Sequence, residues 1–191
     1  MLLSDGSTMR LYRQTVQDFG LYPGLDLTEE EFSCLQNAVG ELSAKMRAVR
    51  IVSASSVSKR DLEQRLIQKG ENPTQAKQAV AWMSDLNLLD DRKTAEQVVH
   101  RCISKGYGLA RAKQALYEKR IPKELWEDAL ADYPDQTEHI AEFLRSRLGD
   151  SWEEKDLRKA IDALMRRGHN YSQIRKALQT LSEDCDFAEE F

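Results

Sequence analysis

The feature that most constrains the fold is an internal repeat of about 50 residues. Leu66, Leu116 and Leu164 lie 50 and 48 residues apart, and the residues around them align without a gap. The equivalent positions are Leu62, Ala112 and Ala160 four residues earlier, Ala76, Trp126 and Ile174 ten residues later, and Val80, Leu130 and Leu178 fourteen residues later. A unit of this size cannot bury its apolar face alone, so neighbouring units are expected to stack.

Each unit carries the start and stop signals of a pair of helices. In the first unit Ser58 begins a helix that Gly70 ends, and Asn72 followed by Pro73 begins the next helix. The third unit repeats these signals with Ser151, Gly168 and Asn170. A longer amphipathic segment precedes each pair, at residues 41–54, 91–105 and 135–148. The pattern therefore predicts three helices in each unit.

The predicted fold is mainly all-α, an elongated and curved array of three tandem three-helix repeats at residues 41–90, 91–134 and 135–181. Residues 1–40 form a separate N-terminal segment. In it an Asp5-Gly6 step predicts a β-hairpin, and a capping box from Thr28 to Glu31 begins a helix. Residues 182–191 are expected to be an acidic tail without a fold. With 9 Gly and 4 Pro, the chain lacks the turns of a β-sandwich.

Charge varies along the chain. The formal net charge is −4, but both ends are acidic, and residues 41–182 carry a net charge of +5. An acidic whole-chain balance would argue against nucleic-acid partners, whereas the middle of the chain alone does not. Neither a signal peptide nor an apolar run of about 18 residues is evident, so we expect a cytoplasmic protein.

The sequence predicts no catalytic residue, no cofactor and no metal site. His100, His139 and His169 are far apart, and Cys34, Cys102 and Cys185 have neither C-x-x-C spacing nor an even number. Asp90 and Asp91 point apart on a helix, where capping is the expected role. Gly106-Tyr107-Gly108 has no preceding strand and no third glycine, so it indicates a flexible helix junction rather than a phosphate loop.

Basic residues gather in the second and third units. The binding candidates are Lys105, Arg111, Lys119 and Arg120 in the second unit and Arg158, Lys159, Arg166, Arg167, Arg175 and Lys176 in the third. Composition alone favours ordinary solvated helix faces for them. Tyr107, between two glycines, is a candidate exposed aromatic anchor, whereas Trp126 aligns with core positions. Arg158, Lys159, Arg166 and Arg167 are expected to flank the buried stripe of one helix and to stay exposed.

Several of these motifs resemble the RecX family, regulators of the bacterial RecA recombinase. The resemblance rests on Ala48 to Ile51 followed by Ser58, Leu62 and Leu66; on Leu89-Asp90-Asp91; on Ser104-Lys105-Gly106-Tyr107-Gly108; on Glu118-Lys119-Arg120-Ile121; and on Ala163 to Gly168 with Ile174 to Leu178. The resemblance extends over about residues 41–181. The chain departs from the family pattern at Ser55, where Arg is usual, at Thr94, where Phe is usual, and at Arg120, where Gly is usual.

The resemblance implies a non-enzymatic protein that binds RecA filaments on single-stranded DNA and blocks ATP hydrolysis, strand exchange and coprotease activity. It thereby implies a role in homologous recombination, DNA repair and the SOS response, as a monomer. The alternative is a helical-repeat scaffold that binds another protein and has no nucleic-acid role. Salt distinguishes the two, because phosphate binding weakens steeply as salt rises.

Overall fold

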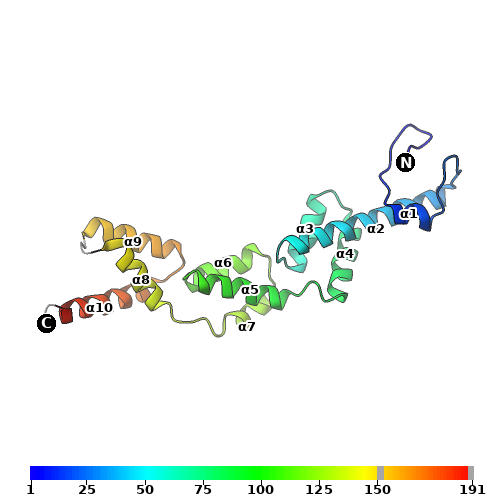
Figure 1. Ribbon diagram of the computed structural model, residues 1–191. Helices are drawn as coiled ribbons and strands as arrows, with labels where there is room; N and C mark the ends of the chain where they lie inside the picture. The colour runs from blue at the N-terminus through cyan, green and yellow to red at the C-terminus, as the bar shows by residue number, and fades with distance from the viewer. Residues whose placement is uncertain (150–152, 189–191) are drawn as a thin grey trace. The chain divides into compact units, whose positions relative to one another are not determined.

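The computed structural model describes the backbone of residues 1–149 and 153–188 and the side chains of residues 1–149 and 153–181. The chain forms two compact units, Met1–Asp90 and Asp91–Phe191. Helices dominate both units, as the repeat pattern predicts (Figure 1).

The N-terminal segment contains a turn and a short helix instead of the predicted β-hairpin. The turn is present, because the Asp5 carboxylate accepts a hydrogen bond from the Ser7 amide at 2.8 Å. Beyond it, one isolated bridge joins Leu2 and Thr8, and residues 1–40 form no strand. A ladder this short is marginal, and the chain soon turns into helix α1 (Arg13–Asp18).

Helix α2 (Glu29–Ala54) is longer than predicted, because the helix begun by the capping box continues into the first unit. The Thr28 hydroxyl accepts from the Glu31 amide at 3.2 Å, and the Glu31 carboxylate accepts from the Thr28 amide at 2.9 Å. Gly40 lies within this helix. A Cβ atom there would overlap the end of the Gln75 side chain of α4, whose Nε2 donates to the Asn37 carbonyl at 3.4 Å.

Helices α2, α3 (Lys59–Gln68) and α4 (Pro73–Asp85) share one core. The predicted caps are observed: Ser58 accepts from the Asp61 amide at 3.1 Å and Asn72 from the Thr74 amide at 2.9 Å. The core residues are Ala44, Ala48, Val57, Leu62, Leu66, Ala76, Ala79, Val80, Met83 and Leu89. The N-terminal segment before Ala44 contributes none of them.

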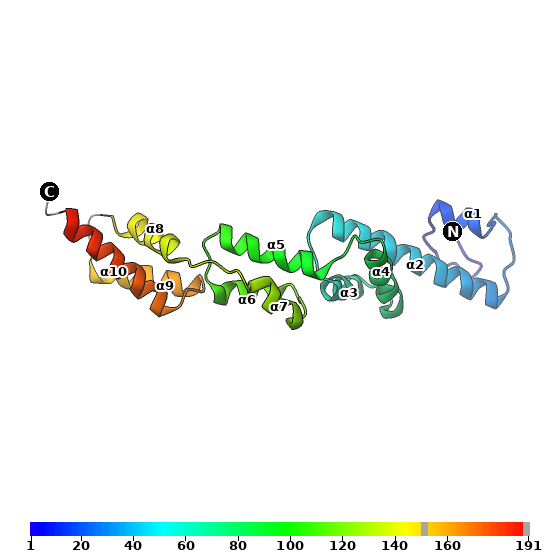
Figure 2. The same ribbon diagram turned by 90° about the horizontal axis from the view of Figure 1, so that it is seen from below.

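The second compact unit contains two groups of helices. One group consists of α5 (Asp91–Ser104), α6 (Leu109–Glu118), a 3₁₀ turn η1 (Lys123–Leu125) and α7 (Trp126–Leu130). The other consists of α8 (Thr137–Leu148), α9 (Glu154–Arg166) and α10 (Tyr171–Ala188), which lie together in both views (Figures 1 and 2). Each group has its own apolar core.

The C-terminal predictions are met in part. Asn170 accepts from the Gln173 amide at 2.8 Å, as a helix cap should, whereas Ser151 lies outside the described residues. Helix α10 continues to Ala188, so the backbone of residues 182–188 is helical where a tail without a fold was expected. Residues 189–191 of that predicted tail lie outside the described residues.

The repeat register is confirmed by burial. Leu66, Leu116 and Leu164 are 0%, 0% and 1% exposed. Their carbonyl oxygens accept the same hydrogen bond in each unit, from the amide five residues later, at 3.1, 3.1 and 3.2 Å. Trp126 is half-buried against the core, and its Nε1 donates to the Ile121 carbonyl at 3.0 Å.

The residue that ends the leucine-bearing helix has a left-handed backbone in all three units. Gly70 and Gly168 have φ of +90° and +87°, values that glycine adopts without strain. Arg120 occupies the equivalent position with φ of +54°. The departure from glycine at Arg120 is therefore accommodated without a change of backbone conformation, at the cost of local strain.

Candidate functional site

The two helix groups of the compact unit Asp91–Phe191 meet where α6 begins and α9 ends (Figure 2). The Gly108 amide donates to the Arg167 carbonyl at 3.0 Å, and the Ala110 amide donates to the Gly168 carbonyl at 3.3 Å. Helix N-termini leave amides without partners, and helix C-termini leave carbonyls without partners. Here each end satisfies the other, and the two helix dipoles meet with opposite signs. We call this contact the α6–α9 junction.

Two glycines make this close approach possible. A Cβ atom on Gly108 would overlap the Gly168 carbonyl, and a Cβ atom on Gly168 would overlap the main-chain nitrogen of Arg111. Gly168 also needs its left-handed φ to end α9. The Gly106-Tyr107-Gly108 segment is thus a helix junction, as the sequence predicts. It is held by the Gly108–Arg167 main-chain hydrogen bond rather than being the flexible link that was expected.

Two side chains hold the same loop from its other side. His169, 3% exposed, contacts the Gly106 carbonyl through Nε2 at 3.0 Å. A carbonyl can only accept, so Nε2 carries a proton in this contact. The Tyr133 hydroxyl donates to the Tyr107 carbonyl at 2.6 Å. Tyr107 itself is half-buried, so it is not the freely exposed anchor that the sequence suggested.

Burial shifts the pKa of both His169 and Tyr133. It lowers the pKa of His169, outweighing the hydrogen bond to Gly106, which acts in the opposite direction. Arg167 and His139 lower that pKa further by charge repulsion. Burial also raises the pKa of Tyr133 to about 12, so its hydroxyl stays protonated and remains a donor. The loop is therefore held by neutral donors at neutral pH.

The junction brings members of the two predicted basic groups close in space. Lys105 precedes the loop and Arg111 lies in the first turn of α6, while Arg166 and Arg167 end α9. The backbone of Arg167 bonds to Gly108, so residues nearly 60 positions apart in the sequence become neighbours. Sequence reasoning identified these cations but did not predict that they would be adjacent.

Most candidate cations are exposed, as expected. Lys105, Arg120, Arg158, Lys159, Arg166, Arg167, Arg175 and Lys176 are exposed, while Arg111 and Lys119 are half-buried. The predicted placement on α9 is confirmed for the cations, because Arg158, Lys159, Arg166 and Arg167 are exposed. Of the apolar stripe that they flank, Ala160 and Leu164 are buried, whereas Leu157 and Ile161 are half-buried.

Several of these cations already contact an acidic or aromatic side chain. The ion pairs are Arg111–Glu118 at 2.9 Å, Arg158–Glu154 at 3.1 Å, Lys159–Asp156 at 2.7 Å and Lys176–Asp135 at 3.3 Å. The Arg167 guanidinium lies 4.5 Å from the centre of the Phe143 ring. Within the described part of the chain, Lys105, Arg166 and Arg175 form no ion pair.

The Arg111–Glu118 pair is supported from both sides. Its hydrogen bond raises the pKa of the Arg111 guanidinium and lowers the pKa of the Glu118 carboxyl. Gln114 donates a second hydrogen bond to Glu118 at 3.3 Å, which also lowers that pKa. Glu118 is therefore already paired with Arg111, and an external anion would have to compete with it for that guanidinium.

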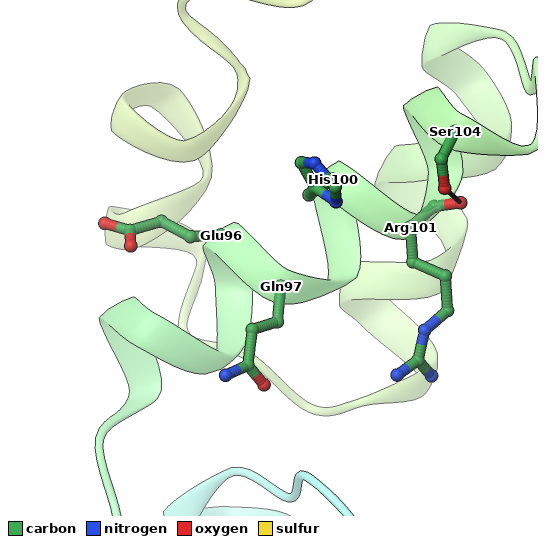
Figure 3. Close-up of a pocket in the computed structure, with 5 residues that line it drawn as sticks. All are labelled: Glu96, Gln97, His100, Arg101 and Ser104. Atoms are coloured by element: carbon green, nitrogen blue, oxygen red, sulfur yellow. Dashed lines mark hydrogen bonds between the residues drawn. The ribbon is translucent and has the colours of Figure 1, made fainter.

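The hollow on α5 does not have the geometry of an active site. Its lining residues, Glu96, Gln97, His100, Arg101 and Ser104, all come from one helix and do not converge on a point (Figure 3). The Ser104 hydroxyl donates to the Arg101 carbonyl at 3.2 Å, so no base activates it. The described residues contain no cluster of metal-ligating side chains, and no described helix is long and apolar enough to span a membrane.

Comparison with known proteins gives one consistent family. Residues 90–130 match the model of the RecX second three-helix domain. The regulatory protein RecX of Vibrio parahaemolyticus is 29% identical over 146 residues, covering 75% of this chain and 94% of that protein. The RecX of Xanthomonas axonopodis pv. citri is 31% identical over 148 residues, covering 75% and 91%. A crystal structure of a regulatory protein RecX matches 92% of this chain and 91% of its own with a TM-score of 0.66 and 18% identity, which shows the same fold.

Proposed function

Because this chain belongs to the RecX family of regulatory proteins, we propose that it regulates the RecA recombinase without catalysing a reaction. In this proposal it acts as a cytoplasmic monomer, binds the RecA filament on single-stranded DNA, and lowers the recombinase, ATPase and coprotease activities of that filament. The acting surface consists of the basic residues on both sides of the α6–α9 junction.

The observation that supports this proposal is the adjacency of two basic groups that are far apart in the sequence. The Gly108–Arg167 hydrogen bond fixes the start of α6 against the end of α9. Lys105 and Arg166, which form no ion pair within the described residues, then lie on either side of that contact. Cations held in this way attract phosphates without first losing an internal partner.

The cations that already have carboxylate partners contribute less to this surface. Arg158, Lys159 and Lys176 each sit within 3.3 Å of an acidic oxygen, so binding an external anion means exchanging one partner for another. Exposed pairs of this kind are worth only about 0–1 kcal/mol. We therefore assign the larger share of binding to Lys105, Arg166 and Arg167.

The test is inhibition of RecA ATP hydrolysis on single-stranded DNA by the double variant Arg166→Glu, Arg167→Glu. The matched control is Arg60→Glu, Lys77→Glu, which reverses the same charge at exposed residues of α3 and α4. Both variants should melt at nearly the parent temperature, since exposed charges contribute little to stability. We expect the first variant to lose inhibition and the control to keep it.

Direct DNA binding is measured separately, by titrating a labelled single strand at several salt concentrations. Loss of two phosphate contacts reduces the salt slope by about 1.4, since each contact contributes roughly 0.7 for single strands. If inhibition falls while DNA affinity is unchanged, the arginines contact RecA itself. A folded double variant that inhibits as well as the parent would refute the assignment. Inhibition absent even from the parent would leave the protein-binding scaffold as the function.

A further inference from the structure

The N-terminal segment of the compact unit Met1–Asp90 lines an apolar groove that the proposed function does not use. The groove has a volume of about 1080 Å³ and lies between residues 1–5, α1, the loop at residues 21–28 and the first turn of α2. Leu11, Val16, Leu25 and Phe32 are among its lining residues. Pockets that enclose a drug-sized molecule measure about 300–1,000 Å³, so this groove has room for more than one anchoring side chain.

Packing in this segment is incomplete. Among residues 1–34 only Thr15 is buried, and the large apolar side chains that face the groove are half-buried or exposed. Leu2 is 73% exposed and Tyr22 is 63% exposed. These side chains therefore leave apolar surface of the groove open to contact with another molecule.

Charge restricts what could occupy the groove. Asp5, Asp26 and Glu29 line it, and no lysine, arginine or histidine does. The ammonium group of Met1, which is also a lining residue, donates to the Met9 carbonyl at 2.8 Å and keeps its charge, so three acidic groups face one cation. An anionic ligand such as a nucleic acid would be repelled, whereas a cationic segment would be attracted.

We propose that this groove binds a basic amphipathic segment of another protein. Apolar side chains of that segment enter the groove, and its lysines or arginines meet Asp26 and Glu29 at the rim. This mode combines apolar anchors with charge complementarity. The proposal is independent of the RecA assignment, because it uses neither the basic residues nor the α6–α9 junction.

The experiment measures binding of a labelled leucine–lysine helical peptide to the full chain by fluorescence anisotropy. Two comparison peptides keep the length: one replaces every lysine by glutamate, and one permutes the sequence so that the leucines no longer share a face. We expect the amphipathic basic peptide to bind more tightly than either. A preference for the glutamate peptide, or equal binding of all three, would overturn the proposal.

Variants then locate the binding site. Tyr22→Ala should weaken binding by about fivefold or more, as loss of an aromatic anchor does. Glu29→Gln should weaken it by about twofold to fivefold, as loss of an exposed ion pair does. The matched controls are Tyr171→Ala, 60% exposed on α10, and Glu30→Gln, which neighbours Glu29 without lining the groove.

The controls should bind the peptide as the parent does, and circular dichroism should show that all four variants fold. Equal effects of Tyr22→Ala and Tyr171→Ala would overturn the location. Sedimentation of the parent tests the other occupant. If the chain self-associates and Tyr22→Ala abolishes the association, the groove holds a second copy, and the proposal of a foreign basic segment is wrong.

Discussion

Replacing Gly168 by alanine should damage the protein more than the same change at Gly70. The two glycines occupy equivalent positions with φ of +87° and +90°. An alanine in this left-handed conformation costs about 1–2 kcal/mol at either place. Nothing lies within 4 Å of a Cβ atom at Gly70, whereas at Gly168 it would overlap the main chain of Arg111. Relieving that overlap breaks the two hydrogen bonds of the α6–α9 junction, at about 0.5–1.5 kcal/mol each.

The expected loss of stability is therefore about 1–2 kcal/mol for Gly70→Ala and about 2–5 kcal/mol for Gly168→Ala. Urea unfolding followed by circular dichroism measures both. Gly108→Ala is a third variant: its φ of −77° suits alanine, so it isolates the steric overlap from backbone strain. Equal losses at Gly70 and Gly168, with no loss at Gly108, would mean that the junction does not form in solution.

Three further predictions concern single side chains. Arg120→Gly should raise stability by about 0.5–1 kcal/mol, because it relieves a left-handed backbone; an unchanged urea midpoint would mean that contacts of the arginine side chain offset the strain. Glu118→Gln should strengthen binding of single-stranded DNA at low salt by a few fold, because it releases Arg111; unchanged anisotropy titrations would remove Arg111 from the binding surface. Burial lowers the pKa of His169, so its contribution to stability is complete above the unfolded value of about 6.5 and is lost as pH falls towards the lower folded value. His169→Gln should flatten the decline in stability as the pH falls below 6.5, which urea unfolding at a series of pH values measures; an equally steep decline in the variant would contradict this.

Features set by neighbours in the sequence could be predicted. Ser58 and Asn72 cap helices as expected, because a cap joins residues two or three positions apart. The leucine register was correct because burial follows the helical period. The hairpin prediction was wrong because an Asp-Gly step specifies a turn and leaves open whether strands of useful length flank it.

The α6–α9 junction could not be predicted from the sequence, because it joins main-chain atoms of Gly108 and Arg167 that no local pattern relates. The alignment of Gly168 with Gly70 predicts that Gly168 ends a helix. It does not predict that Gly168 also packs against the main chain of Arg111. His169 looked like an isolated histidine, and Tyr133 was not singled out. Both matter because of where their hydrogen bonds end, at carbonyls of the Gly106–Gly108 loop.

The end of α9 combines a structural contact with a charged surface, so charge and position can be varied separately. Arg166→Glu with Arg167→Glu changes the charge and keeps the glycine contact. Gly168→Ala keeps every charge but moves the end of α9 away from Lys105 and the start of α6. If the arrangement of the cations matters, Gly168→Ala should lose inhibition of the RecA filament while the salt dependence of its DNA binding stays close to the parent's, since the same number of cations remains. Inhibition retained in a folded Gly168→Ala protein would show that net charge suffices, and the junction would then serve stability alone.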